Sequence, residues 1–104
     1  MTRFEVIQKQ RREAHEAAAR ATWAELRAAL GALGIEYRLF GSLKNGDFME
    51  HSDIDLMIMG DPDQDTVRQI RQAIAAAGRS RDIDIDLHFA RDMTSDFQEA
   101  LLER

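Results

Sequence analysis

The sequence contains no cysteine, and this absence excludes disulfide bonds and thiolate metal sites. It also lacks any apolar run that is long enough to cross a bilayer. The first residues include no continuous apolar region of the kind that a signal peptide requires. We therefore expect a protein without disulfides that is located in the cytoplasm.

Basic residues are too few to dominate the charge of the chain. Fourteen lysines and arginines stand against 19 aspartates and glutamates, which gives a formal net charge of −5 at pH 7. A field of this sign does not favour duplex DNA, RNA or an anionic membrane surface. A nucleoside triphosphate held through a divalent cation remains compatible with it, because a bound cation inverts the local electrostatics.

The residues that are present suffice for one folded domain. The chain has 104 residues, of which 44% are hydrophobic and 32% are charged, as in an ordinary globular protein. We find no internal repeat, linker or low-complexity tract. We expect a single domain over residues 1–104, with an N-terminal helix in 1–34, a sheet region in 35–89 and a C-terminal helix in 90–104.

The N-terminal third predicts one long helix over residues 2–33. Thr2 and Glu5 have the spacing of a capping box, and the alanine-rich composition of residues 14–32 favours helix at nearly every position. Gly34 is suited to close the helix. Its buried stripe is predicted from apolar residues that recur at helical spacing: Trp23, Leu26, Leu30 and Leu33.

Charged residues occupy positions 9–16 of this helix, and we expect this run, including His15, to face solvent. A smaller apolar cluster precedes it, formed by Phe4, Val6 and Ile7. A helix of about 30 residues is about 45 Å long, more than a domain of this size needs. The alternative is therefore that the front of the helix projects past the domain and packs on a partner.

Three strands are predicted from alternating or apolar patterns, at residues 37–40, about 53–59 and about 82–89. In the second strand, one face carries Ile54, Leu56 and Ile58. The other face carries Asp53, Asp55, Met57 and Met59. The two methionines are expected to fill the core or, alternatively, to form the floor of a pocket for a base.

A helix separates the second and third strands. Asp61 is expected to be its N-cap, Pro62 fits its first turn, and Gly78 is expected to end it. Thr94 or Ser95 is expected to cap a last short helix. The order helix, strand, strand, helix, strand, helix predicts a small α/β (α+β) fold: a mixed sheet with helices packed on one face and an acid-lined face left open.

Candidate functional residues gather between Gly41 and Leu56. Asp53 and Asp55 are two positions apart, so on a strand their side chains leave the same face and repel each other unless a cation lies between them. Hard oxygen ligands of this kind suit Mg²⁺ better than zinc or copper. At the other end of the stretch, the backbone of Gly41 and the hydroxyl of Ser42 can receive a phosphate oxygen.

A site with two metal ions for nucleotidyl transfer needs about three carboxylates around ions that are roughly 3.5–4 Å apart. The third strand offers three aspartates on one face, Asp82, Asp84 and Asp86. These positions span about 13 Å at the rise of a strand, so only one of them can lie opposite the first pair. Spacing alone does not choose among them.

The combined pattern of Gly41-Ser42, ten residues, and Asp53-Ile54-Asp55 resembles the signature of the DNA polymerase β-like nucleotidyltransferases. The short chain resembles their minimal branch, the MNT proteins, and the resemblance covers about residues 37–89. In this family the third carboxylate lies on a later strand and is commonly followed by an apolar pair. Asp86-Leu87 fits this pattern best, although His88 interrupts the pair, and Asp84-Ile85 is the runner-up.

The resemblance implies that Asp53, Asp55 and Asp86 bind two Mg²⁺ ions and that Asp86 is the base for an acceptor hydroxyl. The nucleotide, ATP or another triphosphate, is then expected to contact Gly41, Ser42, Lys44 and Ser52. Many members carry an arginine in the turn after Gly-Ser, whereas here Lys44 is the only cation in that turn. His51 and His88 are expected to be surface residues or hydrogen-bond donors to the ligands.

The resemblance further implies transfer of a nucleoside monophosphate, often adenylate, to an acceptor hydroxyl. Minimal members are commonly antitoxins paired with a HEPN-type ribonuclease toxin, and some adenylylate a tyrosine of that toxin. One alternative is an antitoxin or regulatory subunit that acts by binding and occlusion without useful catalysis. Transfer to an antibiotic or another small molecule is less favoured. The base preference, the acceptor and the oligomeric state stay open.

Overall fold

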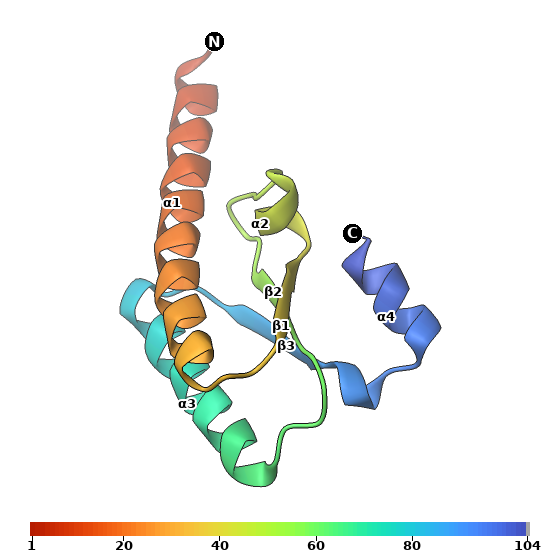
Figure 1. The fold of residues 1–104 in the computed structure, drawn as a ribbon. Helices are drawn as coiled ribbons and strands as arrows, with labels where there is room; N and C mark the ends of the chain where they lie inside the picture. The colour runs from red at the N-terminus through yellow and green to blue at the C-terminus, as the bar shows by residue number, and fades with distance from the viewer. Residues whose placement is uncertain (104) are drawn as a thin grey trace.

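The structure is a computed structural model that describes residues 1–103, and its centre is a three-stranded mixed sheet flanked by helices (Figure 1). The predicted fold class is thereby confirmed, while Arg104 of the predicted C-terminal helix region lies outside the described residues. The elements in chain order are α1 (Arg3–Ala32), β1 (Tyr37–Phe40), α2 (Ser42–Asn45), β2 (Ile54–Ile58), α3 (Gln64–Arg81), β3 (Ile85–Phe89), a 3₁₀ helix (Ala90–Asp92) and α4 (Ser95–Leu102).

Helix α1 begins and ends where the sequence predicts. The Thr2 hydroxyl accepts a hydrogen bond of 3.1 Å from the backbone N–H of Glu5, which satisfies one of the free donors of the first turn. Leu33 is the C-cap, and Gly34 follows with a φ of 69°, the left-handed conformation that glycine adopts without steric cost. The 30-residue helix runs along the long dimension of the molecule, whose extents are 51 × 31 × 15 Å (Figure 1).

The strands are arranged in the order β1-β2-β3. β1 pairs with β2 antiparallel, and β2 pairs with β3 parallel. A parallel pair needs a crossover connection, and α3 provides it. The predicted second and third strands are slightly long, because regular pairing begins at Ile54 and at Ile85.

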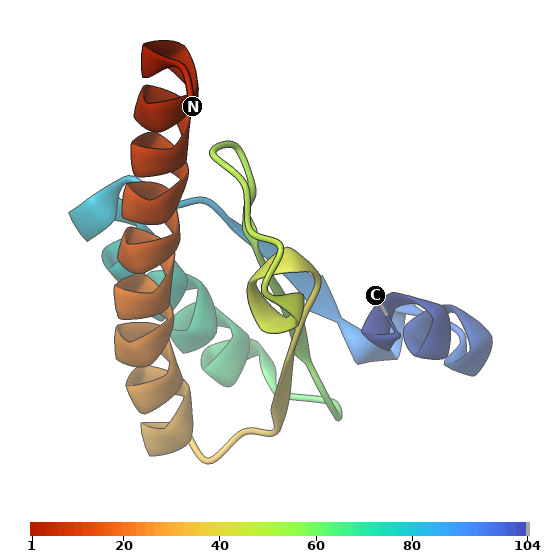
Figure 2. The same ribbon diagram turned by 90° about the horizontal axis from the view of Figure 1, so that it is seen from above.

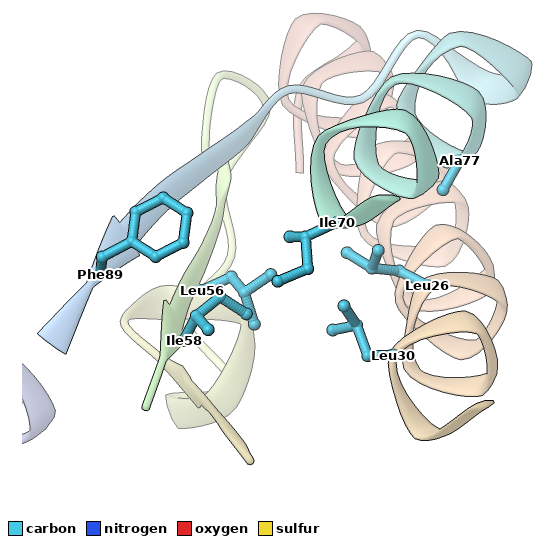
Figure 3. Close-up of a cluster of buried hydrophobic side chains, with 7 residues drawn as sticks. All are labelled: Leu26, Leu30, Leu56, Ile58, Ile70, Ala77 and Phe89. Carbon is cyan, nitrogen blue, oxygen red and sulfur yellow. The ribbon is translucent and has the colours of Figure 1, made fainter. Parts of the chain in front are cut away.

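Helices α1 and α3 cover one face of the sheet (Figures 1 and 2). Ile54, Leu56 and Ile58 of β2 point into this layer and are fully buried, as the alternating pattern predicts. Figure 3 shows how side chains from α1, α3, β2 and β3 meet there. The cluster consists of Leu26, Leu30, Leu56, Ile58, Ile70, Ala77 and Phe89.

Helix α4 lies on the opposite side of the sheet from α1 and α3 (Figures 1 and 2). Its Leu101 packs with Phe40 and Met57, and Met57 is fully buried. The expectation that helices pack on one face only is therefore corrected, because α4 covers part of the second face. Met57 fills the core, as one of the two alternatives predicted, and is too buried to form the floor of a base pocket.

The ends of α3 differ from the prediction. Its N-cap is Asp63, and not Asp61, because the carboxylate of Asp63 accepts a hydrogen bond of 2.8 Å from the N–H of Thr66. The helix continues past Gly78 to Arg81 and ends at Asp82, whose φ is 54°. Gly78 is needed for close approach instead, since a Cβ there would lie 2.6 Å from the Ile83 carbonyl oxygen.

Thr94 caps α4 by accepting a hydrogen bond of 3.2 Å from the N–H of Phe97, which decides between the two predicted caps. None of the helices in residues 1–103 combines the length and the apolar character that crossing a membrane would require.

Candidate active site

The strand register brings one carboxylate of β3 opposite one carboxylate of β2. Asp55 is paired with Phe40 of β1 on one side and with Asp86 of β3 on the other. Paired residues of neighbouring strands point to the same face and are about 4.8 Å apart along the hydrogen-bonding direction. Of the three aspartates that the sequence leaves open, Asp86 is thus the one that lies beside Asp55.

Asp53 lies one residue before β2 and is exposed. Together with Asp82 and Asp84 it lines a cavity of about 290 Å³ at the beginning of the two parallel strands. Asp84 is tied to this region through its backbone, because its carbonyl accepts a hydrogen bond of 3.0 Å from the N–H of Ile54. The acids therefore form two neighbouring groups, one within the paired strands and one at their entrance.

The donor set of this region is chemically suited to a hard divalent cation, because it consists of carboxylate oxygens from two adjacent strands. Within residues 1–103, no three side chains of the aspartate, glutamate, histidine and cysteine types lie close enough together to hold a metal ion. Asp53, Asp55 and Asp86 are thus neighbours in the fold without being gathered around one point.

Gly41 joins the predicted phosphate end of the site to its acid end. A Cβ at Gly41 would lie 2.0 Å from Oδ2 of Asp55, a distance that no side chain can occupy. The backbone of Gly41 also has φ 77° and ψ −155°, which is a conformation for glycine alone. Glycine is therefore required here for two independent reasons, and the Asp55 carboxylate lies directly against the β1–α2 turn.

The other predicted nucleotide-binding residues surround this turn or precede Asp53. Ser42 is half-buried and Lys44 is exposed, while Leu43 between them is buried and anchors α2. Ser52 closes the turn before Asp53. Its hydroxyl accepts a hydrogen bond of 2.9 Å from the N–H of Met49, and its own N–H donates to the Met49 carbonyl at 3.1 Å.

His88 contacts the carboxylate of Asp86, with 3.1 Å between Nε2 and Oδ2. A carboxylate accepts, so the imidazole donates in this bond. The ring of His88 also lies 5.5 Å from that of Phe40, and its side chain is 26% exposed. Of the two alternatives predicted for His88, the second agrees with the structure: His88 donates a hydrogen bond to Asp86, a candidate metal ligand. His51, in contrast, is exposed.

His15 is a residue that sequence reasoning missed. It is predicted to face solvent, but its ring stacks on Phe48 at 5.1 Å with an interplanar angle of 19°, and its Nε2 lies 3.0 Å from the Ser52 carbonyl oxygen. The helical spacing of the sequence could have predicted that His15 is not solvent-facing. His15 lies four residues before Ala19, which is on the buried side of α1, and the side chains of residues four apart lie on one face of a helix.

A comparison with protein families matches residues 36–104 to the family described as Polymerase beta, Nucleotidyltransferase. The chain belongs to this family. No curated protein and no solved structure was found to match it. The nucleotidyltransferase domain of this family indicates transferase activity, and such domains typically use a metal ion and a nucleoside triphosphate. The match begins after α1, so the long helix lies outside the matched region.

Proposed function

We propose that this chain is a Mg²⁺-dependent nucleotidyltransferase that transfers a nucleoside monophosphate, in the first instance AMP, to a hydroxyl of a partner protein. The observation that carries the proposal is the register that places Asp86 beside Asp55, whose carboxylate lies against Gly41. This arrangement unites the three separate parts of the sequence pattern in one place on the sheet.

In this proposal Asp53, Asp55 and Asp86 hold two Mg²⁺ ions. When bound, the ions offset the charge of the triphosphate and stabilise the charge that develops on the attacking and leaving oxygens. Asp86 accepts the proton of the acceptor hydroxyl, whose oxygen bonds to the α-phosphorus as the bond to the pyrophosphate oxygen breaks. His88 holds the Asp86 carboxylate in place through its hydrogen bond.

Gly41 and Ser42 are proposed to contact the phosphates, with Lys44 as the nearby cation and Ser52 at the entrance of the site. Support comes from the close approach of Asp55 to Gly41, because it brings the turn and the acids within reach of one nucleotide. Lys44 is exposed and so can reach a phosphate without first breaking a buried contact.

The proposed acceptor is a protein, and its proposed identity is a HEPN-type toxin for which this chain is the antitoxin. The resemblance to the minimal nucleotidyltransferases supports this partner. The apolar front of α1 supports a protein partner independently, because Phe4 is 68% exposed. The N-terminal end of α1 extends beyond the sheet (Figure 1).

The test is to incubate the protein with Mg²⁺, ATP labelled at the α-phosphate and the protein that its neighbouring gene encodes. Label is expected on the partner. The double variant Asp53→Ala/Asp55→Ala is expected to lose at least about 10³-fold in rate, since metal ions supply several kcal/mol of charge stabilisation. The matched control is the exposed acidic pair Asp92→Ala/Asp96→Ala, which should transfer label like the wild type.

A second candidate function is inhibition of the partner by binding alone. The exposed residues Phe4, Val6 and Ile7 favour it, because they offer an apolar surface without any role in catalysis. If the wild type transfers no label while the Asp53→Ala/Asp55→Ala variant still neutralises the partner, binding is the function and the catalytic proposal fails.

A further inference from the structure

We propose that His15 of α1 is a positioning residue for the nucleotidyl-transfer site, where it fixes the loop that carries Asp53. The inference rests on the proposed function, because it assigns a role to His15 only if Asp53 binds the metal and nucleotide. It goes beyond the family match, since His15 belongs to the helix that lies outside the matched residues.

Two contacts hold His15 against the loop. Its ring stacks on Phe48, which is almost fully buried, in the offset geometry that aromatic rings prefer. Its Nε2 lies 3.0 Å from the carbonyl oxygen of Ser52, and because a carbonyl only accepts, Nε2 carries the hydrogen. The stack sets where the ring lies, and the hydrogen bond then sets where Ser52 lies.

Ser52 passes this constraint to Asp53, its neighbour in the chain. On its other side Asp53 is followed by Ile54, which is fully buried and whose N–H donates to the Asp84 carbonyl at 3.0 Å. Asp53 is thus an exposed residue between two fixed ones. Of the two fixed neighbours, Ile54 is held by the sheet, and Ser52 is held by its own turn through Met49 and by α1 through His15.

A second contact from α1 reaches the other end of the site but is weaker. Nη2 of Arg20 lies 3.4 Å from the Leu43 carbonyl oxygen, and its side chain is about half exposed. The His15 contact is shorter, and its ring is anchored by a buried partner. His15 is therefore the α1 residue that we expect to control the site.

The experiment uses the full-length protein and Mn²⁺ as the probe, titrated alone and with ATP and followed by the spectroscopic signal of free Mn²⁺. His15→Phe keeps a ring on Phe48 and removes the donor, whereas His15→Gln removes the ring and keeps a donor. The control is Arg11→Gln, at an exposed position one turn earlier on the same helix. Thermal midpoints and the amide resonances of Ser52 and Asp53 are recorded for each variant.

Outer contacts that orient a metal ligand typically account for a factor of 10–100 in affinity, and an indirect contact should lie near the lower end, at about 10-fold. We expect His15→Phe to bind Mn²⁺ about 10-fold more weakly, with shifted Ser52 and Asp53 amides. His15→Gln should recover most of this affinity, and Arg11→Gln should match the wild type.

Two results would overturn the inference. One is a folded His15→Phe variant that binds Mn²⁺ like the wild type. The other is an equal loss in His15→Phe and in the control Arg11→Gln, because it would show an effect of any change on this part of α1 and no specific role for the His15 donor. A wild-type protein that binds neither Mn²⁺ nor Mn²⁺ with ATP would instead overturn the proposed function, and this inference with it.

Discussion

The two faces of the sheet are built from the same three strands but are completed in different ways. The face toward α1 and α3 carries apolar residues in all three strands and packs against these two helices. The other face is divided. Phe40 and Met57 are buried against α4, whereas Asp55, which is paired with Phe40, is half-buried and Asp86 beside it is exposed.

The difference shows that a strand face need not have a single role. Asp55 and Met57 are two positions apart on β2 and point the same way, yet one is a candidate metal ligand and the other is a core residue. The apolar half gives the sheet a second packed layer next to the acids. We infer that this layer stabilises the strands whose register brings the carboxylates together.

The largest expected effect on stability comes from Met57→Ala in the apolar half of the divided face. Truncating a fully buried side chain of this size typically costs about 2–5 kcal/mol, because it leaves a cavity. The change should appear as a lower midpoint in urea unfolding. Met49→Ala is the control, since Met49 is exposed and should change stability little. A loss below about 1 kcal/mol would show that α4 does not cover Met57 in solution.

Gly41→Ala tests the acidic part of the same face. The new Cβ would collide with the Asp55 carboxylate, and the backbone conformation is strained for alanine, at a cost of about 1–3 kcal/mol. The rate of nucleotidyl transfer should fall by a larger factor than this loss of folding free energy would cause. Gly46→Ala is a matched control, because Gly46 has a φ of 84° but open space around its Cα. Equal losses of activity in the two variants would argue against a special contact between Gly41 and Asp55.

Thr22→Val should stabilise the packing between α1 and the sheet face toward α1 and α3. Thr22 is fully buried on α1, and within residues 1–103 its Oγ1 has no hydrogen-bond partner. Replacing an unpaired buried hydroxyl by a methyl group of the same shape removes a desolvation cost, so we expect stabilisation of about 1 kcal/mol in urea unfolding. Destabilisation would show that the hydroxyl has a partner, such as water, in solution.

The smallest expected effect concerns the N-cap of α3, the helix that covers this face. Hydrogen bonds from the N–H and hydroxyl of Thr66 lower the pKa of Asp63 below its ordinary value. A lowered pKa means that the contribution to stability is present above the unfolded-state pKa and is lost as pH falls through the folded-state pKa. Asp63→Asn should keep the cap but lose this part of the acid dependence of unfolding. Asp61→Asn is the control and should keep that dependence. A loss in Asp61→Asn instead of Asp63→Asn would show that Asp61 is the cap.

Much of the fold could be predicted because local patterns and tertiary packing agree. The capping box at Thr2, the glycine at Gly34 and the alternation of β2 each encode an element through short-range geometry. The ends of α3 could not be predicted as well. Gly78 looks like a helix end in sequence, but only the approach of the Ile83 carbonyl reveals why glycine is there.

By itself, the sequence indicated the kind of candidate site: two acids two positions apart, a glycine and serine before them, and an acid-rich segment after them. Tertiary structure decided the rest, because register and helix placement depend on how strands far apart in the chain pair and pack. It placed Asp86, and not Asp82 or Asp84, beside Asp55, buried Met57 under α4 and brought His15 to the loop before Asp53.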